Sequence, residues 1–220
     1  CEDPYRTRPA IELSLNILFE DGHLAVADKP AGIEVSGNRR WTLENALAFN
    51  LSQSSEPDAL KFFQPIHRLD YPTSGALLIG KTATSVMALN RLFEERRVKK
   101  VYHAVTIGKM DGPGIIETPI GGKASKTTVG VLQTLESDRF AYLNLVELEP
   151  HTGRRHQLRI HLAGMGNPIL GDHDYGKEGL ILKGKGLYLH ASSLLFQHPI
   201  TKAELHVEAP LPKKFRKLFL

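Results

Sequence analysis

Cysteine is nearly absent from this chain of 220 residues, and its one example is the first residue, Cys1. A single thiol can form neither an internal disulfide framework nor a cluster of thiolate ligands for zinc. Chains without disulfides are typical of reducing compartments, so we expect the protein to work in the cytoplasm.

Long hydrophobic runs are absent as well. Apolar stretches such as residues 76–79 fall far short of the roughly 18 residues that a membrane-spanning helix needs, which predicts no transmembrane segment. The sequence also lacks a strong excess of one sign of charge, since it contains 28 lysines and arginines and 24 aspartates and glutamates. The net charge of +4 and the pI near 9.1 suit a polyanionic partner, but they are equally typical of an ordinary solvated surface.

The composition that remains, 41% hydrophobic and 24% charged, is that of one folded domain with a substantial core. Residues 1–10 contain Pro4 and Pro9 and lack any periodic apolar pattern. We therefore divide the chain into an N-terminal arm, residues 1–10, and a single catalytic domain, residues 11–220.

Short strands dominate the apolar pattern. The Asp21-Gly22 pair between two apolar stretches predicts a β-hairpin over residues 15–29. Thr42 is placed to cap a short helix, and apolar residues at helical spacing predict a second helix from Thr84. Further strands are expected at 101–107, 127–134, 140–148, 187–196 and 203–208. Strands without regular helical crossovers favour an α+β fold with a mixed sheet.

Three separated segments carry the most specific pattern. They are residues 64–75 (QPIHRLDYPTSG), residues 100–104 (KVYHA) and residues 152–159 (TGRRHQLR). In order and spacing they resemble the signature motifs of the RluA-type pseudouridine synthases. Weaker similarity, including residues 166–172 (GNPILGD), extends the resemblance over roughly residues 15–215.

The resemblance implies both a fold and an activity. The expected fold is a long, bent, mostly antiparallel sheet flanked by helices, with an RNA-binding cleft across its middle. The expected activity is the isomerisation of uridine to pseudouridine in a structured ribosomal or transfer RNA, with the target base flipped out of its stack. This reaction needs no metal, redox or nucleotide cofactor, and we expect a monomer that binds RNA and no membrane.

The resemblance also assigns the catalytic residues. Asp70 matches the catalytic aspartate, which either attacks the ribose or base or stabilises positive charge as the glycosidic bond breaks. Arg159 matches the arginine that pairs with this aspartate, and Tyr102 matches an active-site tyrosine that can stack on uracil. Outside such a motif, an aspartate after an apolar strand is most often a turn or capping residue.

Five further residues are expected to contact RNA. Arg68 matches the residue that fills the gap left by the flipped base, because a flat guanidinium can lie between bases. Lys100, Arg154 and Arg155 are placed to contact phosphates. His67 either contacts RNA or packs beneath the catalytic loop, and the second role is slightly favoured.

Two histidine-rich patterns suggest metal sites only superficially. His151, His156 and His161 recur every five residues, a spacing that would point the side chains away from one another on a helix. Asp172-His173-Asp174 lies between glycines, where polar turn residues are common. Gly121-Gly122-Lys123 lacks the spacing of a phosphate-binding loop.

Two other functions remain open on the sequence alone. The first is an RNA-binding domain that does not modify its RNA. The second is a carboxylate-dependent hydrolase of nucleosides or glycosides, which would need a second acidic group as general acid.

Overall fold

The computed structural model of the protein describes residues 10–182 and 184–219. Almost all of the predicted arm therefore lies outside the described residues. The predicted hairpin is present, and the carboxylate of Asp21 accepts hydrogen bonds from the backbone N–H groups of His23 and Leu24 at 2.7 and 2.9 Å. An aspartate in this turn thus ties the chain reversal together.

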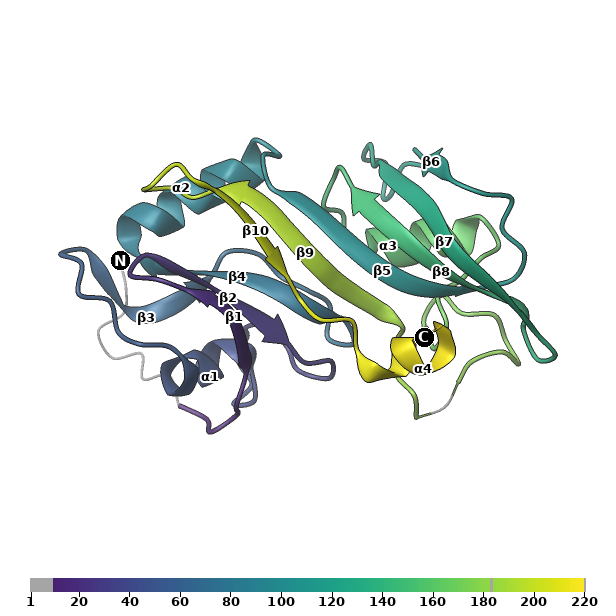
Figure 1. The fold of residues 1–220 in the computed structure, drawn as a ribbon, viewed down its shortest axis with the longest axis horizontal. Helices are drawn as coiled ribbons and strands as arrows, with labels where there is room; N and C mark the ends of the chain where they lie inside the picture. Colours follow the sequence, from purple (N-terminus) through teal and green to yellow (C-terminus); the bar gives the residue numbers. More distant parts are fainter. Residues whose placement is uncertain (1–9, 183, 220) are drawn as a thin grey trace.

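The described residues form one ten-stranded sheet that runs the length of the molecule (Figure 1). Its main path is β1-β2-β4-β9-β5-β8-β7-β6, with β3 added beside β4 and β10 beside β9. The strands are β1 (Asn16–Glu20), β2 (Leu24–Lys29), β3 (Ala59–Pro65), β4 (Ser74–Thr82), β5 (Lys99–Ile107), β6 (Gly114–Ile116), β7 (Thr127–Ser137), β8 (Ala141–Pro150), β9 (Leu189–Gln197) and β10 (Glu204–Glu208).

Two antiparallel halves meet at one parallel joint in this sheet. Only β4 and β9 pair in parallel, and they do so through Ser74 opposite His190 and Gly75 opposite Ala191. Every other strand pair in the described residues is antiparallel. The prediction of an α+β fold with a mixed, mostly antiparallel sheet is therefore confirmed.

Four helices flank the sheet in the described parts of the chain: α1 (Leu43–Asn50), α2 (Ala83–Glu94), α3 (Gln157–Gly164) and α4 (Lys213–Phe219). The Thr42 side chain accepts a hydrogen bond from the Asn45 N–H, as the capping prediction requires. The second predicted helix starts at Ala83, one residue early, because Thr82 and Ser85 form a reciprocal capping box. None of these helices is long and apolar enough to cross a membrane.

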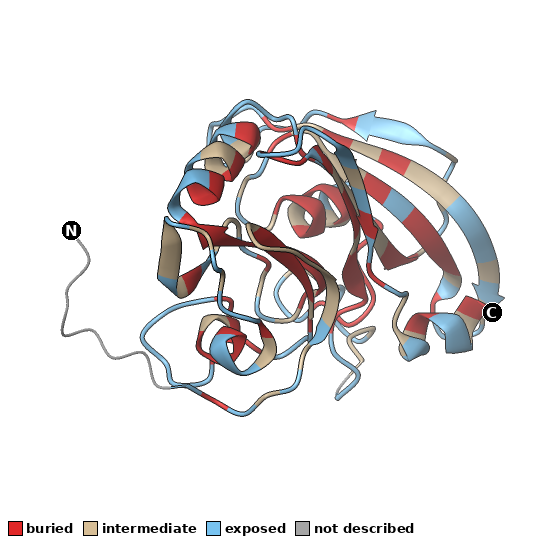
Figure 2. Cartoon of the chain, turned by 60° about the vertical axis from the view of Figure 1, so that its left-hand side comes forward, coloured by how far each residue is buried: buried red, intermediate tan, exposed pale blue. Residues whose placement is uncertain are grey.

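The core follows the two halves of the sheet. Buried residues line both surfaces of the strands and the inward faces of the helices, whereas the outward faces are exposed (Figure 2). One apolar cluster belongs to the half that contains β5, β7 and β8, and two clusters belong to the half that contains β2 and β4. Tyr102 packs against clusters of both halves, so it lies where the halves meet.

Glycine is required at the joint itself. Gly75 has a φ of +119°, and a Cβ atom at this position would lie 2.2 Å from the Ala191 carbonyl oxygen. Because the obstacle is backbone, no side-chain rotation can relieve the clash. The Ser74 hydroxyl adds a 2.9 Å hydrogen bond to His190 Nδ1 at the next pair of the same joint.

We predict that Gly75→Ala lowers the free energy of unfolding far more than Gly112→Ala. Gly112 has a similar φ of +114° but nothing within 4 Å of the added carbon, so it isolates the cost of the backbone angle. That strain costs about 1 to 3 kcal/mol, and the clash at Gly75 adds about 3 kcal/mol or more. Chemical denaturation of both variants measures the difference, and equal losses would contradict a close approach at the joint.

Candidate active site

The loop between β3 and β4 carries Asp70 in a tight turn. The Thr73 N–H donates to the Asp70 carbonyl at 3.0 Å, and the Gly32 N–H donates to the Tyr71 carbonyl at 2.8 Å. Leu69, the residue before Asp70, is 5% exposed and belongs to the apolar core. Backbone hydrogen bonds and the burial of Leu69 thus hold the turn in place. They fix the backbone position from which the half-buried Asp70 side chain extends.

A buried lysine lies beside this turn. Lys29, at the end of β2, is fully buried, and its Nζ donates to the Pro30 carbonyl at 2.9 Å and the Tyr71 carbonyl at 3.4 Å. Burial lowers the pKa of Lys29 to about 8, and the negative charge of Asp70 partly opposes this shift. Sequence reasoning missed Lys29, which follows four apolar residues and Asp28 in β2 and directly precedes Pro30.

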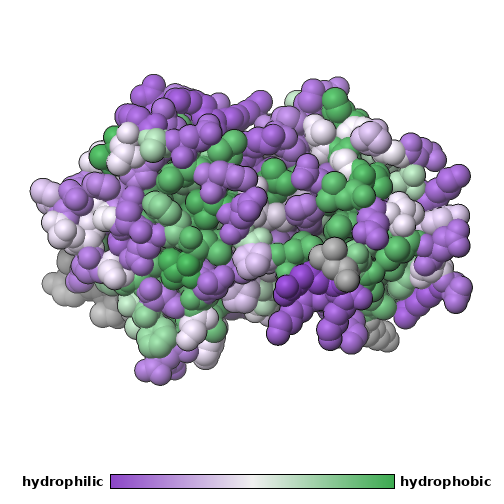
Figure 3. Space-filling view, viewed as in Figure 1, coloured by the Kyte–Doolittle hydropathy of each residue, from purple (hydrophilic) through white to green (hydrophobic). Residues whose placement is uncertain are grey.

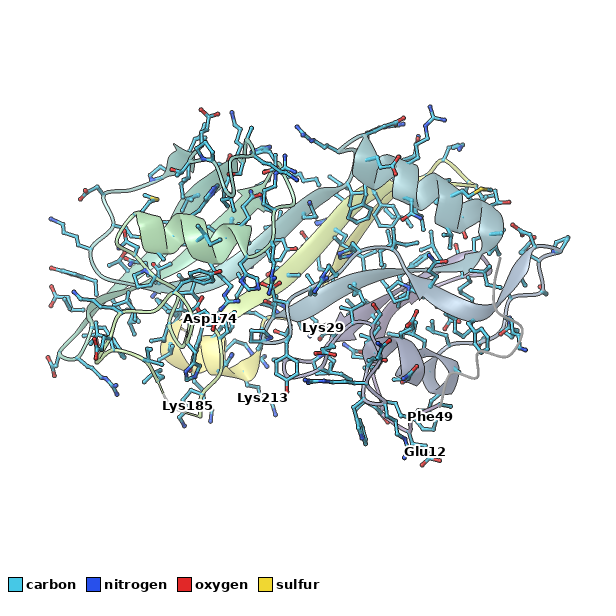
Figure 4. All side chains as sticks on the ribbon, turned by 180° about the vertical axis from the view of Figure 1, so that it is seen from behind. Glu12, Lys29, Phe49, Asp174, Lys185 and Lys213 are labelled. Atoms are coloured by element: carbon cyan, nitrogen blue, oxygen red, sulfur yellow. The ribbon has the colours of Figure 1, made fainter. Side chains whose placement is uncertain are left out.

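All eight residues predicted for the site line one cleft of about 850 Å³. Asp70 and its neighbours come from the β3–β4 loop, Tyr102 from β5 and Arg159 from α3. Figure 4 shows this side of the molecule, with Lys29 and Asp174 labelled on either side of its centre. The cleft therefore spans the joint between the two halves. The lining residues from the prediction are His67, Arg68, Asp70, Lys100, Tyr102, Arg154, Arg155 and Arg159.

Tyr102 lies opposite Ala191 in the pairing of β5 with β9, next to the joint. Burial raises the pKa of the Tyr102 hydroxyl, and the negative charge of Asp70 raises it further. The phenol therefore stays protonated at neutral pH and can donate a hydrogen bond. Its ring forms part of the cleft wall, where a planar base could stack on it.

Arg159 has its shortest contacts with two carboxylates other than Asp70. Its Nε and Nη2 donate to both oxygens of Asp172 at 2.7 Å, and Nη2 also donates to Asp174 at 2.6 Å. Asp70 Oδ2 lies 3.8 Å from Arg159 Nη1. The expected pairing of Arg159 with Asp70 is thus a longer-range contact, because the planar guanidinium fork matches the Asp172 carboxylate.

The Arg159–Asp172 pair is buried, with the two residues 3% and 1% exposed. Burial by itself lowers the pKa of Arg159, but the hydrogen bonds and charges of Asp172 and Asp174 outweigh it and raise the pKa overall. Burial likewise raises the pKa of Asp172, and its bonds to Arg159 reverse the direction. Both groups are therefore held in their charged forms.

The segment considered as a metal cluster, Asp172-His173-Asp174, is a turn that orients Arg159. Asp172 Oδ1 accepts the backbone N–H groups of Asp174 and Tyr175 at 3.0 and 3.1 Å, which is the expected behaviour of a turn aspartate. No group of three or more metal-ligating side chains occurs in the described part of the chain. Sequence reasoning recognised the turn but missed the contact of its carboxylates with Arg159.

His156 is a second residue that sequence reasoning left outside the site. Its backbone is left-handed, with φ 54° and ψ 23°, an uncommon conformation for a residue with a side chain. His156 Nδ1 lies 2.9 Å from the Tyr175 hydroxyl, and Nε2 lies 3.8 Å from Asp70 Oδ1. The ring thus lies between Tyr175 and the carboxylate of Asp70.

His151, His156 and His161 do not lie on one helix, contrary to what we assumed when we considered their spacing. Helix α3 begins at Gln157, so only His161 lies within it. His151 Nε2 instead lies 2.8 Å from the Thr128 hydroxyl, and His161 is buried against Ser125 and Thr127. The left-handed turn at His156 separates the three side chains, a feature that spacing along the sequence does not reveal.

The remaining predicted residues differ in whether their side chains are already engaged in contacts within the protein, and His67 is engaged. His67 Nε2 accepts the Leu78 N–H at 3.1 Å, and its ring stacks on Phe93 at 4.8 Å. Burial, with a smaller contribution from the charge of Lys100, lowers the pKa of His67 to about 3. His67 is therefore neutral and packed, which favours the structural role of the two considered.

The guanidinium groups at the mouth of the cleft are more accessible. Arg68 and Arg155 are exposed, and Arg154 is half-buried with its Nε donating to the Ala124 carbonyl at 3.1 Å. Burial lowers the pKa of the partly buried Lys100, and the charge of Arg96 adds to this shift. The cleft thus combines one partly exposed carboxylate, an aromatic wall and several cations near its opening, an arrangement suited to a polyanionic substrate with a planar base.

Comparison with known proteins gives the same assignment. Residues 23–164, more than half of the chain, match the family described as RNA pseudouridylate synthase. The chain is 35% identical over 219 residues to the uncharacterized RNA pseudouridine synthase YhcT of Bacillus subtilis (strain 168), covering 93% of this chain and 71% of the relative. It is 34% identical over 221 residues to ribosomal large subunit pseudouridine synthase C of Rickettsia bellii (strain RML369-C), covering 92% and 70%.

A solved structure agrees with the sequence matches. Human RNA Pseudouridylate Synthase Domain Containing 1 superposes with a TM-score of 0.76 at 26% identity, over 93% of this chain and 86% of that chain. Fold, sequence and the residues around the cleft therefore lead to one conclusion. The chain belongs to the RNA pseudouridylate synthase family.

Proposed function

We propose that this protein isomerises uridine to pseudouridine in a structured ribosomal RNA, with Asp70 as the catalytic carboxylate. The observation that carries the proposal is the common cleft, in which Asp70, Tyr102 and Arg159 come from three separate elements. Ribosomal RNA is favoured over transfer RNA because the Rickettsia relative is named for the large ribosomal subunit.

The reaction moves one bond and one proton. The ribose C1′–N1 bond breaks, the uracil turns, a C1′–C5 bond forms, and the proton lost from C5 is replaced by one gained at N1. An ionised carboxylate serves either route, by attacking the sugar or base or by stabilising positive charge on the ribose. The cations Lys29 and Arg159 place positive charge near the Asp70 carboxylate in both cases.

Arg159 acts in this proposal as a fixed positive charge. Asp172 and Asp174 hold its Nε and Nη2, which leaves Nη1 toward Asp70 at 3.8 Å. This arrangement costs no reorientation when the substrate binds, because the guanidinium is already held by the protein. Tyr102 supplies a protonated phenol and an aromatic surface for the extruded uracil.

Extrusion of the base leaves a gap in the RNA that needs a planar substitute. Unstacking a nucleotide costs roughly a few kcal/mol, and the cost is greater in a folded RNA than in an unstructured strand. Arg68 is exposed at the cleft two residues before Asp70, so its guanidinium can enter the vacated stack. Lys100, Arg154 and Arg155 would meet the phosphates around it.

The other parts of the proposal follow from the same cleft. One chain supplies all of the proposed site residues, which supports action as a monomer. Isomerisation is redox-neutral and releases nothing, so it requires no cofactor. The lack of disulfide-forming cysteine pairs supports a cytoplasmic location. Residues 11–220 are proposed to form the catalytic domain.

The alternatives are less well supported. A glycoside-type hydrolase would need a second acidic group free to donate a proton, whereas Asp172 is held ionised by Arg159. A domain that only binds RNA would have no use for a carboxylate surrounded by cations in the same cleft. The two alternatives also predict different products from the first experiment below.

We predict that RNA carrying tritium at uracil C5 releases its label when incubated with the protein, and that Asp70→Asn binds the same RNA but releases none. The amide cannot attack or carry the negative charge that the reaction requires. Asp138→Asn, at an exposed turn outside the cleft, is the control and should release label at the native rate. Equal release by the Asp70→Asn form and the native protein would discard the assignment.

We predict that Asp172→Asn lowers the free energy of unfolding by about 3 kcal/mol, because the buried Arg159 then keeps only the exposed Asp174 as a hydrogen-bonded carboxylate and Asp70 at 3.8 Å. The rate of tritium release at saturating RNA should fall as well, since the guanidinium loses its orientation. Asp174→Asn is the matched control, with a side chain 61% exposed, and should cost less than about 1 kcal/mol. Equal losses in the two variants would show that the buried pair does not position Arg159.

We predict that Arg68→Ala reduces turnover on a folded RNA hairpin more than on an unstructured strand of the same sequence. The reason is that base flipping costs less in the unstructured strand, so filling the gap matters less. Arg155→Ala, which removes an exposed arginine from the same cleft, should reduce both rates by a similar factor. A loss of equal size on both RNAs in Arg68→Ala would remove the gap-filling role.

A further inference from the structure

Positive charge is concentrated in one short helix. Helix α4 contains four lysines and arginines and no acidic residue, whereas the whole chain has 28 cations and 24 acids. Outside α4 the two signs therefore balance, and the net charge of +4 equals the contribution of this helix. In Figure 3, strongly hydrophilic side chains gather over α4, below and to the right of the centre of the molecule.

The helix is anchored by its apolar side. Phe215 and Phe219 are buried, and the former packs against Tyr188 and His190. Lys214 Nζ donates to the Leu187 carbonyl at 2.6 Å and lies 4.4 Å from the Tyr188 ring centroid. Helix α4 is thus a fixed part of the domain, and one of its four cations is committed to holding it there.

The other three cations face outward. Lys213, Arg216 and Lys217 are exposed, and none of them forms an ion pair with a described residue. Lys213 lies three and four positions before the other two, so like charges share one helix face. Such pairs destabilise a helix by about 0.2 to 0.5 kcal/mol each, which is a cost without benefit to folding.

Helix α4 contacts the end of an extension of the active-site cleft through Lys214. A second cavity of about 630 Å³ shares Asp70, Arg155 and Arg159 with the cleft and continues to Gly186 and Leu187. Leu187, which lines this cavity, also accepts the hydrogen bond from Lys214 through its carbonyl, so α4 is attached to a residue of the cavity wall. In Figure 4, Lys185 and Lys213 are labelled below Asp174.

We propose that the exposed face of α4, formed by Lys213, Arg216 and Lys217, binds phosphates of the substrate RNA strand as it leaves the active-site cleft through the second cavity. This inference rests on the proposed function and extends the RNA contact beyond the cleft residues. Lys185, whose carbonyl accepts a hydrogen bond from Lys214 Nζ at 3.5 Å, is a further exposed cation beside α4. Cations on a rigid backbone, unpaired by protein acids, are suited to phosphate neutralisation with release of counterions.

An anionic membrane is the other polyanion to consider, and the structure disfavours it. An interfacial helix inserts an apolar face between lipids. In α4 that face is already used, because Phe215 and Phe219 are buried in the domain. RNA needs only the charged face, and the adjoining cleft supplies the remaining contacts.

The test is the salt dependence of RNA binding by the double variant Lys213→Gln with Lys217→Gln. The probe is an unmodified large-subunit ribosomal RNA transcript, and both variants compared carry Asp70→Asn so that no turnover occurs. We expect the slope of log Kd against log salt concentration to fall in magnitude by about 1.5, because two phosphate contacts are lost. Glutamine has a helix propensity close to that of lysine, so α4 should persist.

Lys61→Gln with Lys109→Gln is the matched control, because it removes the same charge from exposed residues on β3 and in the loop after β5, outside both cavities. Its slope should stay unchanged. Lys213→Arg with Lys217→Arg should retain the native slope, since it keeps both charges. Equal slopes in the α4 and control glutamine variants would overturn the proposal, as would failure of the arginine variant to retain the slope.

Two further measurements separate this proposal from the proposed function. With Asp70 intact, release of C5 tritium by the native protein tests the proposed function without involving any α4 variant. Release by the native protein together with an unchanged salt slope in the variant would remove the α4 surface but leave the activity standing. Binding to phosphatidylserine vesicles that is lost in the variant, with RNA binding unaltered, would assign the surface to a membrane instead.

Discussion

The close approach of β4 to β9 at Gly75 and Ala191 is the constraint on which the rest of the structure depends. Only two residue pairs form this parallel joint, yet it unites two antiparallel halves into one sheet. Asp70 precedes the joint by a few residues, and Tyr102 pairs with Ala191 on its other side. A side chain at position 75 would separate the halves and, with them, the two walls of the cleft.

Charge in the cleft is organised by groups that themselves need support. Arg159 is buried and would be costly without partners, and Asp172 and Asp174 hold it in place. Lys29 is buried beside the turn that carries Asp70 and is held by backbone carbonyls. The carboxylate of Asp70 therefore lies among cations whose positions are fixed before any RNA arrives, which is the preorganisation that electrostatic catalysis requires.

Cations on the surface around the cleft differ from those in its interior in how they are paired. Inside, Lys29 and Arg159 are held by protein groups, whereas Lys213, Arg216 and Lys217 of α4 form no ion pair with a described residue. A polyanionic strand that enters the cleft at one nucleotide must pass over neighbouring surface, and we propose that α4, attached to Leu187 of the second cavity, meets that strand. Base chemistry and strand binding are thus assigned to separate groups, one preorganised and one open to solvent.

The sequence by itself determined the local features and the identities of the reacting groups. Turn and cap residues such as Asp21 and Thr42 act through neighbours along the chain, so their hairpin and helix were predictable, and the motifs around Asp70, Tyr102 and Arg159 indicated the family. Only the tertiary structure decided which carboxylates hold Arg159, that Lys29 lies beside Asp70, and that His156 turns toward the cleft. These contacts join residues brought together by the joint between the two halves or by a left-handed turn, and neither leaves a periodic pattern in the sequence.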